Sequence, residues 1–188
     1  MPIFFGRPST AKMQQFQQAQ QQLSYSYPEQ GTTAAKAFPK PYHHDRYRCY
    51  LGQGDDCWQA AKAALTHWQM FPKAWTIIYP KNVPQAVGQD VSVMIQLGPI
   101  YWLNGARVVY NYNEINRYGF AYGTLTSHAE KGEELFMLER NEKGEVFFVL
   151  EAFSLPQHPL AKLGAPFVRL LQKRFAKAAQ AAIKEACP

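Results

Sequence analysis

Six segments with strand character follow one another between residues 75 and 154, and this succession constrains the fold most. Most of these segments are rich in β-branched or aromatic residues, and turn-forming residues lie between them. The segments cover residues 75–79, 87–97, 100–113, 118–126, 134–140 and 146–154. Since no helical pattern separates them, they pair through short turns, such as the one that ends at Gly144. The sequence therefore predicts an antiparallel sheet, with the helices set apart from it.

Three further elements precede this run. Ser9 can cap a helix that continues to about Leu23. Residues 46–51 have the alternation of a strand. A second helix follows an N-cap pair that begins at Asp55, and it ends before Pro72. We expect the segment 27–42, which contains three prolines, to be a loop.

The last predicted element is a long amphipathic helix. It begins near Pro159, is interrupted around Gly164 and Pro166, and continues to about Ala186. Its apolar stripe consists of Phe167, Leu171, Phe175, Ala178 and Ala182. The predicted fold class is therefore α+β: a curved antiparallel sheet of about seven strands, packed on this helix, with an extra N-terminal helix.

We expect two parts in the chain: a glutamine-rich N-terminal helix in residues 1–24, and a single α+β domain in residues 25–188. Seven glutamines lie between Gln14 and Gln22, and we interpret them as a solvated helix face without chemistry.

Composition excludes several classes of protein. Of the 188 residues, 47% are hydrophobic and 14% aromatic, which excludes an intrinsically disordered chain. The uncharged central stretch 91–103 is far shorter than the roughly 20 residues of a membrane-spanning helix. The three cysteines form neither a disulfide framework nor a zinc motif, and no signal peptide is visible. We therefore expect a cytoplasmic protein with neither a metal site nor a cofactor.

The net charge of +6 is concentrated in the last helix, because residues 159–188 carry six cations and one anion. Such a face can attract an anionic membrane surface or nucleic acid. Solvated lysines near a helix C-terminus give the same pattern without any partner. We consider nucleic acid the less favoured partner, because no basic groove lined by aromatic residues is visible.

The densest motif signal lies between residues 105 and 156. It contains Arg-Val-Val-Tyr at 107–110, Gly-Phe-Ala-Tyr-Gly-Thr-Leu at 119–125, Ser-His-Ala-Glu-Lys-Gly-Glu-Glu at 127–134 and Ala-Phe-Ser-Leu-Pro at 152–156. These strings resemble the bacterial and plant family called domain of unknown function 1990, over about residues 25–186. Ser127 replaces the family's usual glycine. The resemblance implies no activity and no catalytic residues.

The order of elements resembles the helix-grip fold of the birch-pollen-allergen and START-like proteins. That resemblance implies a cavity for apolar ligands between the sheet and the last helix. Alternation places Gly119, Ala121 and Gly123 on one face of their strand, where either a ligand or a helix could pack.

The densest cluster of titratable side chains contains His128, Glu130, Glu133 and Glu134. It is either a charged loop, in which Glu133 or Glu134 accepts backbone N–H groups or pairs with an arginine, or an acid/base site. Its spacing matches no named metal motif. By contrast, we expect the loop 43–45 (His-His-Asp) to lie on the surface.

Our leading hypothesis is a protein that binds a small apolar or amphipathic molecule between the sheet and the C-terminal helix. The candidate polar anchors are Arg107, Tyr110, Tyr122, His128 and Glu133, and the candidate walls are Trp102 and Phe167. The alternative is an enzyme in which His128 or Glu133 is the acid/base and Tyr122 is the donor. The third hypothesis is association with a membrane or nucleic acid through the basic last helix.

Overall fold

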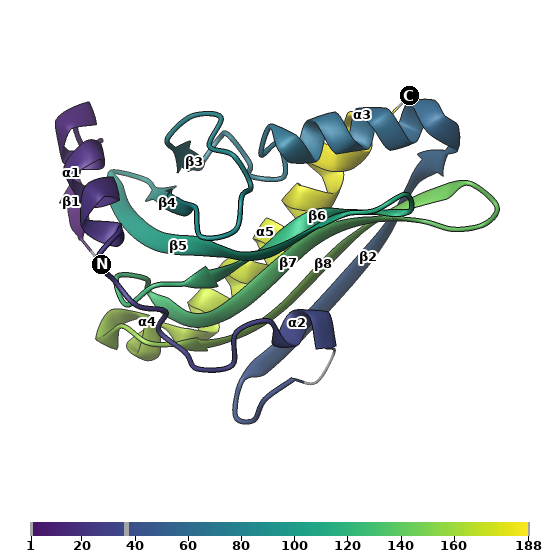
Figure 1. Cartoon of the computed structure of the whole chain (residues 1–188). Helices are drawn as coiled ribbons and strands as arrows, with labels where there is room; N and C mark the ends of the chain where they lie inside the picture. Colours follow the sequence, from purple (N-terminus) through teal and green to yellow (C-terminus); the bar gives the residue numbers. More distant parts are fainter. Residues whose placement is uncertain (1, 36–37, 188) are drawn as a thin grey trace.

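The computed structural model describes residues 2–35 and 38–187, and its centre is one curved antiparallel sheet. The strands are β1 (Ile3–Phe5), β2 (His43–Gln53), β3 (Thr76–Tyr79), β4 (Asp90–Leu97), β5 (Ile100–Asn113), β6 (Arg117–Thr124), β7 (Glu130–Arg140) and β8 (Glu145–Pro156). Their order across the sheet is β2-β8-β7-β6-β5-β4-β3, and β1 pairs with the start of β5. Five consecutive hairpin connections therefore link β3 to β8 (Figure 1).

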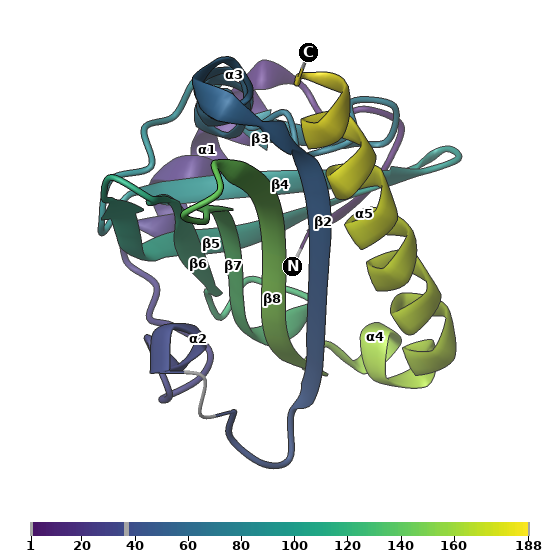
Figure 2. The ribbon, with the colours of Figure 1, turned by 90° about the vertical axis from the view of Figure 1, so that its right-hand side faces the viewer.

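Five helices accompany the sheet in the described part of the chain. They are α1 (Thr10–Gln20), α2 (Thr32–Ala35), α3 (Gly54–Thr66), α4 (Pro159–Leu163) and α5 (Ala165–Glu185). Figure 2 shows α5 and α2 on opposite sides of the sheet. We call the side that carries α3, α4 and α5 the inner face, and the side that carries α1 and α2 the outer face. None of the described helices is long and apolar enough to span a bilayer.

The main core lies between the inner face and the helices α3 and α5. In α3, Trp58, Ala61 and Leu65 recur at helical spacing and are all buried. Just beyond α3, the ring of Trp68 packs edge-on against Phe120 of β6, with 4.7 Å between the ring centroids. The helix α5 buries Ala176, Ala179 and Ile183 on the same core. Its buried stripe is thus offset by about one position from the predicted one.

The outer face is covered as well, by α1 and by the segment 24–35. Met13 of α1 packs on Met94 and Leu103, which are buried on the outer face of β4 and β5. This explains why β4 is buried on both faces and not half-buried, as its alternation had predicted.

The structure confirms the predicted fold class: an antiparallel curved sheet with a long C-terminal helix and an additional N-terminal helix. The strand β5 matches its predicted bounds, and Gly164 separates α4 from α5 as expected. Differences lie at element ends. The strand β7 begins at Glu130, four residues before its predicted start, and α2 forms inside the predicted loop. The N-cap of α3 is Gln53 and not the pair at Asp55.

The glutamine-rich helix is not a purely solvated face. Gln20 is buried, with its Oε1 accepting from Ser127 Oγ (2.5 Å) and its Nε2 donating to the Phe16 carbonyl (2.7 Å). Gln17 bonds to Ser92 and to the Asp90 carbonyl. A glycine at 105 provides the space, because a Cβ there would lie 1.9 Å from Gln20 Oε1. The expectation that this helix is merely solvated is therefore wrong. The division of the chain at residue 24 stays a prediction.

Candidate functional site

A chamber of about 480 Å³ lies between the inner face of the sheet and the helices α4 and α5. Its volume falls in the range typical of small-molecule sites, about 300–1,000 Å³. Most of its wall is apolar. The apolar wall includes Phe71, Trp75, Val93, Ile95, Trp102, Leu150, Phe167, Leu171 and Phe175. The chamber therefore has the shape and lining of a site for a largely apolar ligand.

Polar side chains gather where β2, β7 and α5 meet in the chamber wall. Asp45 from β2 accepts two hydrogen bonds from Arg169 of α5, at 2.6 and 2.8 Å. These bonds hold the pKa of Asp45 below its usual range and raise that of Arg169. The pair ties the C-terminal helix to the edge strand of the sheet. It also leaves Asp45 neutralised within the wall.

The second carboxyl group in this wall is Glu134 of β7. Its Oε2 accepts a hydrogen bond from the hydroxyl of Tyr122 on the neighbouring strand β6, at 2.7 Å. Burial raises the pKa of Glu134 to about 7, and the nearby Glu130 adds to the rise. Burial and the adjacent carboxylate also raise the pKa of Tyr122 well above its usual value. Glu134 consequently changes charge close to neutral pH, inside the chamber.

Glu130, at the start of β7, is the third carboxyl group. Its Oε2 accepts a hydrogen bond of 2.5 Å from Gln172 Nε2, which also donates to Ser154 Oγ. Its other oxygen, Oε1, is buried without a hydrogen-bond partner among the described residues. Burial raises the pKa of Glu130, although the nearby Ser154, Gln172 and Arg169 act to lower it. The chamber wall therefore holds a carboxyl oxygen that can still accept a hydrogen bond.

His128 lies beside this carboxyl group. The backbone N–H of Glu130 donates to His128 Nδ1 at 2.9 Å, so the proton of the neutral ring is on Nε2. Burial lowers the pKa of His128 to about 4. At neutral pH the imidazole is therefore uncharged, and its Nε2–H group can donate a hydrogen bond.

Asn104 of β5 completes the polar wall. Its Oδ1 accepts from the N–H of Ala129 at 3.0 Å, next to Glu130 in the chain. The side chain is almost completely buried, at 1% exposure, and its Nδ2 has no partner among the described residues. An unpartnered donor thus lies in the same stretch of wall as the unpartnered oxygen of Glu130.

Five of the seven candidate binding residues line the chamber, namely Trp102, Tyr122, His128, Glu133 and Phe167, although the carboxylate of Glu133 is engaged on the outer face. Arg107 and Tyr110 do not line the chamber and direct their polar atoms to the outer face, so the expectation that these two face the pocket is wrong. Arg107 pairs with Asp90 at 2.6 Å and donates to the carbonyl oxygens of Gln20 and Leu23. It fastens the C-terminal end of α1 to the sheet.

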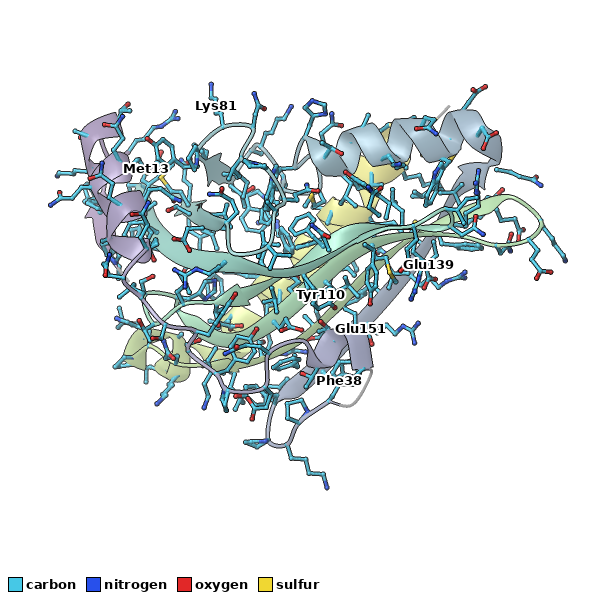
Figure 3. All side chains as sticks on the ribbon, viewed as in Figure 1. Met13, Phe38, Lys81, Tyr110, Glu139 and Glu151 are labelled. Atoms are coloured by element: carbon cyan, nitrogen blue, oxygen red, sulfur yellow. The ribbon has the colours of Figure 1, made fainter. Side chains whose placement is uncertain are left out.

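Glu133 binds the segment 24–35. Its carboxylate accepts from the Tyr27 hydroxyl (2.7 Å), from the Gly31 N–H (2.7 Å), and from the N–H and hydroxyl of Thr33. The Tyr110 hydroxyl lies 2.6 Å from Thr33 Oγ1 in the same network. Figure 3 labels Tyr110 on this side of the sheet, near α2. Of the two interpretations of the cluster, the one in which a glutamate accepts hydrogen bonds from backbone N–H groups therefore describes Glu133.

The small residues of β6 also face outward. A Cβ at Gly123 would lie 2.2 Å from the Tyr27 hydroxyl oxygen, and Ala121 belongs to the outer cluster with Leu135 and Val149. At Gly123 the space is filled by Tyr27 and not by a ligand or a helix, so both interpretations are wrong at this position.

The segment 43–45 belongs to β2 and is not a loop, but His43 and His44 are exposed, as expected. His44 lies 3.3 Å from the buried Glu151 on the outer face, and Asp45 lines the chamber. Glu151 is buried in β8 and needs a cationic partner, which Arg46 supplies at 3.8 Å.

Of the polar wall, sequence reasoning missed Asp45, Asn104 and Gln172, whereas Glu130 and Glu134 belonged to the candidate acid/base cluster. The usable signal was the alternation along β7, which places Glu134 on the same face as the core residues Phe136 and Leu138. Within residues 2–35 and 38–187, no three His, Cys, Asp or Glu side chains are arranged to hold a metal ion.

The cations of the last helix divide into two groups. Arg169 is engaged with Asp45, whereas Lys173, Arg174 and Lys177 are exposed on α5. Association of this face with a membrane or nucleic acid stays a prediction.

Comparison with known proteins places the chain in a family. Residues 26–182 match the model of the family described as "Domain of unknown function (DUF1990)". A UPF0548 protein of Deinococcus radiodurans is 34% identical over 187 residues, which cover 93% of this chain and 94% of that protein. A UPF0548 protein of Dictyostelium discoideum is 31% identical over 192 residues, covering 91% and 89%.

Solved structures share the fold at low sequence identity. A Helicobacter pylori protein aligns over 88% of this chain and 96% of its own, with a TM-score of 0.60 and 11% identity. A Thermus thermophilus protein aligns over 77% of this chain and 96% of its own, with a TM-score of 0.51 and 14% identity. The helix-grip architecture is thereby confirmed as the fold of this chain.

Proposed function

Because the chain belongs to the DUF1990 family and has a helix-grip fold, we propose that it binds a small amphipathic molecule in the chamber. The apolar body of the ligand packs between the sheet and α5, against side chains such as Trp102 and Phe175. Its polar end lies at the wall formed by Glu130, Glu134 and Asn104.

One observation carries this proposal: the chamber is apolar over most of its surface, and its polar groups are collected at one wall. A cavity that merely resulted from loose packing would have no reason to bury carboxyl groups, since burial of an unpaired charge is unfavourable. Glu130 and Asn104 each retain a buried polar atom without a partner among the described residues. A ligand with one polar end satisfies such a wall.

The test uses N-phenyl-1-naphthylamine, a neutral apolar dye whose fluorescence increases in apolar sites. We expect saturable binding of one dye per chain. Ala152 lies in the chamber wall between Asp45 and Glu134, its partners on the neighbouring strands, so Ala152→Phe fills the chamber there. Ala181→Phe, on the exposed side of α5, adds the same group outside the chamber and serves as the matched control.

We expect Ala152→Phe to weaken dye binding by about tenfold or more, and Ala181→Phe to leave it unchanged. Circular dichroism and the urea midpoint establish that both variants fold. Equal dye binding by the two folded variants, or the absence of saturable binding by the unaltered protein, would contradict the proposal. Native mass spectrometry of the purified protein, followed by denaturation, identifies any ligand that co-purifies.

A second candidate function is acid/base catalysis in the same chamber. Glu134 supports it, because its pKa of about 7 and its hydrogen bond to Tyr122 suit proton transfer near neutral pH. His128 is the neighbouring donor, whereas Glu133 is engaged on the outer face. If a co-purifying molecule is converted by the unaltered protein and not by Glu134→Gln, the chain is an enzyme.

We also propose that this function is carried out in the cytoplasm. The three cysteines are free, and Cys57 is buried as a thiol, which favours a reducing compartment. Fractionation of cells that express the tagged chain tests this location.

A further inference from the structure

Two buried polar atoms in the chamber wall lack partners among the described residues, and they are of opposite kinds. Asn104 Nδ2 is a hydrogen-bond donor, and Glu130 Oε1 is an acceptor. The two residues belong to the same stretch of wall, because Asn104 Oδ1 is bonded to the N–H of Ala129, the residue before Glu130. A buried polar group without a partner destabilises the folded state, so this pair indicates a group that supplies both missing bonds.

The charges of the chamber wall add a second constraint. Among the described residues that line the chamber, the charged side chains are all acidic and His128 is neutral, with no lysine or arginine. Arg169, behind the wall, is already bound to Asp45 by both its terminal nitrogens. Glu130 and Glu134 are therefore left without a cation of their own.

We propose that the chamber selects amphipathic amines, and in particular amines with an oxygen on the adjacent carbon, such as a 1,2-amino alcohol. This inference rests on the proposed function and specifies its ligand class. The ammonium group donates to Glu130 Oε1 and to Glu134. The neighbouring oxygen accepts from Asn104 Nδ2, and the alkyl chain occupies the apolar part of the chamber.

An ammonium group suits this wall better than the other common polar ends. A carboxylate would bring a third uncompensated negative charge beside Glu130 and Glu134, and like charges in a buried site repel strongly. A hydroxyl group can satisfy Asn104 and Glu130 but leaves both carboxyl groups without a counter-charge. The ammonium supplies the charge as well as the donors.

Four probes of equal chain length separate these possibilities by displacement of N-phenyl-1-naphthylamine: 2-amino-1-decanol, decylamine, 1-decanol and decanoate. At pH 7.5 we expect decylamine to bind about tenfold more tightly than 1-decanol, and decanoate to bind most weakly. We expect 2-amino-1-decanol to bind about fivefold more tightly than decylamine, through the bond to Asn104.

Two variants assign these preferences to residues. In Glu134→Gln, the affinity for decylamine falls by about fivefold while that for 1-decanol is nearly unchanged, because only the amine interacts with the lost charge. Asn104→Asp keeps the acceptor for the Ala129 N–H but replaces the donor by an oxygen. In this variant we expect 2-amino-1-decanol to bind no more tightly than decylamine. The added charge changes the affinity of both amines and does not restore the difference between them.

The pH dependence gives an independent readout. The groups that face Glu134 are Tyr122 on β6, Glu130 on its own strand, and Asp45 on β2, which Arg169 of α5 neutralises. An alkylammonium stays protonated below about pH 10, as lysine does. Because the ammonium binds the ionised form of Glu134, its affinity rises between pH 6 and 8, and 1-decanol shows no such rise.

The outcomes separate this inference from the proposed function. If the dye binds in the chamber but the amines compete no better than 1-decanol, the function stands and the amine preference is wrong. A preference for decanoate would likewise overturn the amine preference. If the dye does not bind, or binds equally to Ala152→Phe and Ala181→Phe, the chamber itself is not a binding site and both proposals fail.

Discussion

Glu133 and Glu134 are neighbours in β7, and their carboxylates serve opposite faces of the same sheet. The carboxylate of Glu133 accepts four hydrogen bonds, from donors of Tyr27, Gly31 and Thr33 on the outer face. Glu134 accepts one hydrogen bond from Tyr122 in the chamber wall. The first carboxylate holds a chain segment in place, and the second is available to a ligand.

This difference predicts opposite responses to the same substitution. Glu133→Gln removes the charge that four donors share, so we expect it to lower the free energy of unfolding by about 2–3 kcal/mol. Glu134→Gln replaces a carboxylate that burial disfavours, so at pH 8 we expect unchanged or greater stability. Urea unfolding of both variants at pH 8 tests this. An equal loss of stability in both would contradict the assignment of the two faces.

The dependence of stability on pH has two opposing parts. Burial raises the pKa of Glu134 from 4.5 to about 7, so the native state binds more protons than the unfolded state in this range. Its contribution is full below about pH 4.5 and is lost as the pH rises to about 7. Burial lowers the pKa of His128 from 6.5 to about 4, so its contribution is lost as the pH falls through that range.

Single variants separate the two parts. In Glu134→Gln, the loss of stability between pH 4.5 and 7 disappears. In His128→Asn, whose Oδ1 can accept the Glu130 N–H, the loss on the acid side decreases. Urea unfolding at half-unit pH intervals gives the slopes, and each difference curve is expected to amount to about 3 kcal/mol over its range. A difference curve with the opposite sign would refute the corresponding assignment.

Gly123 is expected to tolerate no side chain. A Cβ there would lie 2.2 Å from the Tyr27 hydroxyl oxygen, and that ring is buried and bonded to Glu133. Gly123→Ala should destabilise the protein by about 1–3 kcal/mol through overpacking. It should also increase amide exchange in residues 24–35. In a Tyr27→Phe background, which lacks the nearest atom, the same substitution should have a smaller effect.

Arg107 is expected to matter for stability and not for ligand binding. Arg107→Met leaves Asp90 buried without its cation and frees two carbonyl oxygens near the end of α1, so we expect a loss of about 3 kcal/mol. The double variant with Asp90→Asn should lose less, because no buried carboxylate remains unpaired. Affinity for N-phenyl-1-naphthylamine should be unchanged in both. A parallel loss of dye affinity would place Arg107 in the site after all.

The sequence predicted the sheet well and the chamber wall poorly, for a physical reason. Strand order follows from local alternation and short turns, so β5 matched its predicted bounds. Which face of a strand meets the helix depends on long-range register. The shift in pairing between Val108 and Tyr110 reverses the orientation of the residues beyond it, which placed Tyr110 outside. Glu133 was preferred to Glu134 because the strand was predicted to begin only at Glu134, so that alternation was not applied to Glu133.

The outer network could not be predicted because it joins distant positions. Nothing near Tyr27 or Thr33 indicates a carboxylate partner, and their bonds to Glu133 span 106 and 100 residues. Similarly, Gln20 appeared to belong to a solvated run, although Ser127 binds it from across the sheet. Local pattern carries no information about such contacts.

These long separations have a consequence during synthesis. Thr33 leaves the ribosome 100 residues before Glu133, and at about 5–20 residues per second this is a delay of about 5–20 s. Throughout that time the segment 24–35 cannot form its hydrogen bonds to Glu133, because β7 has not yet been synthesised. The nascent chain can therefore complete its antiparallel hairpins before the covering of their outer face is secured.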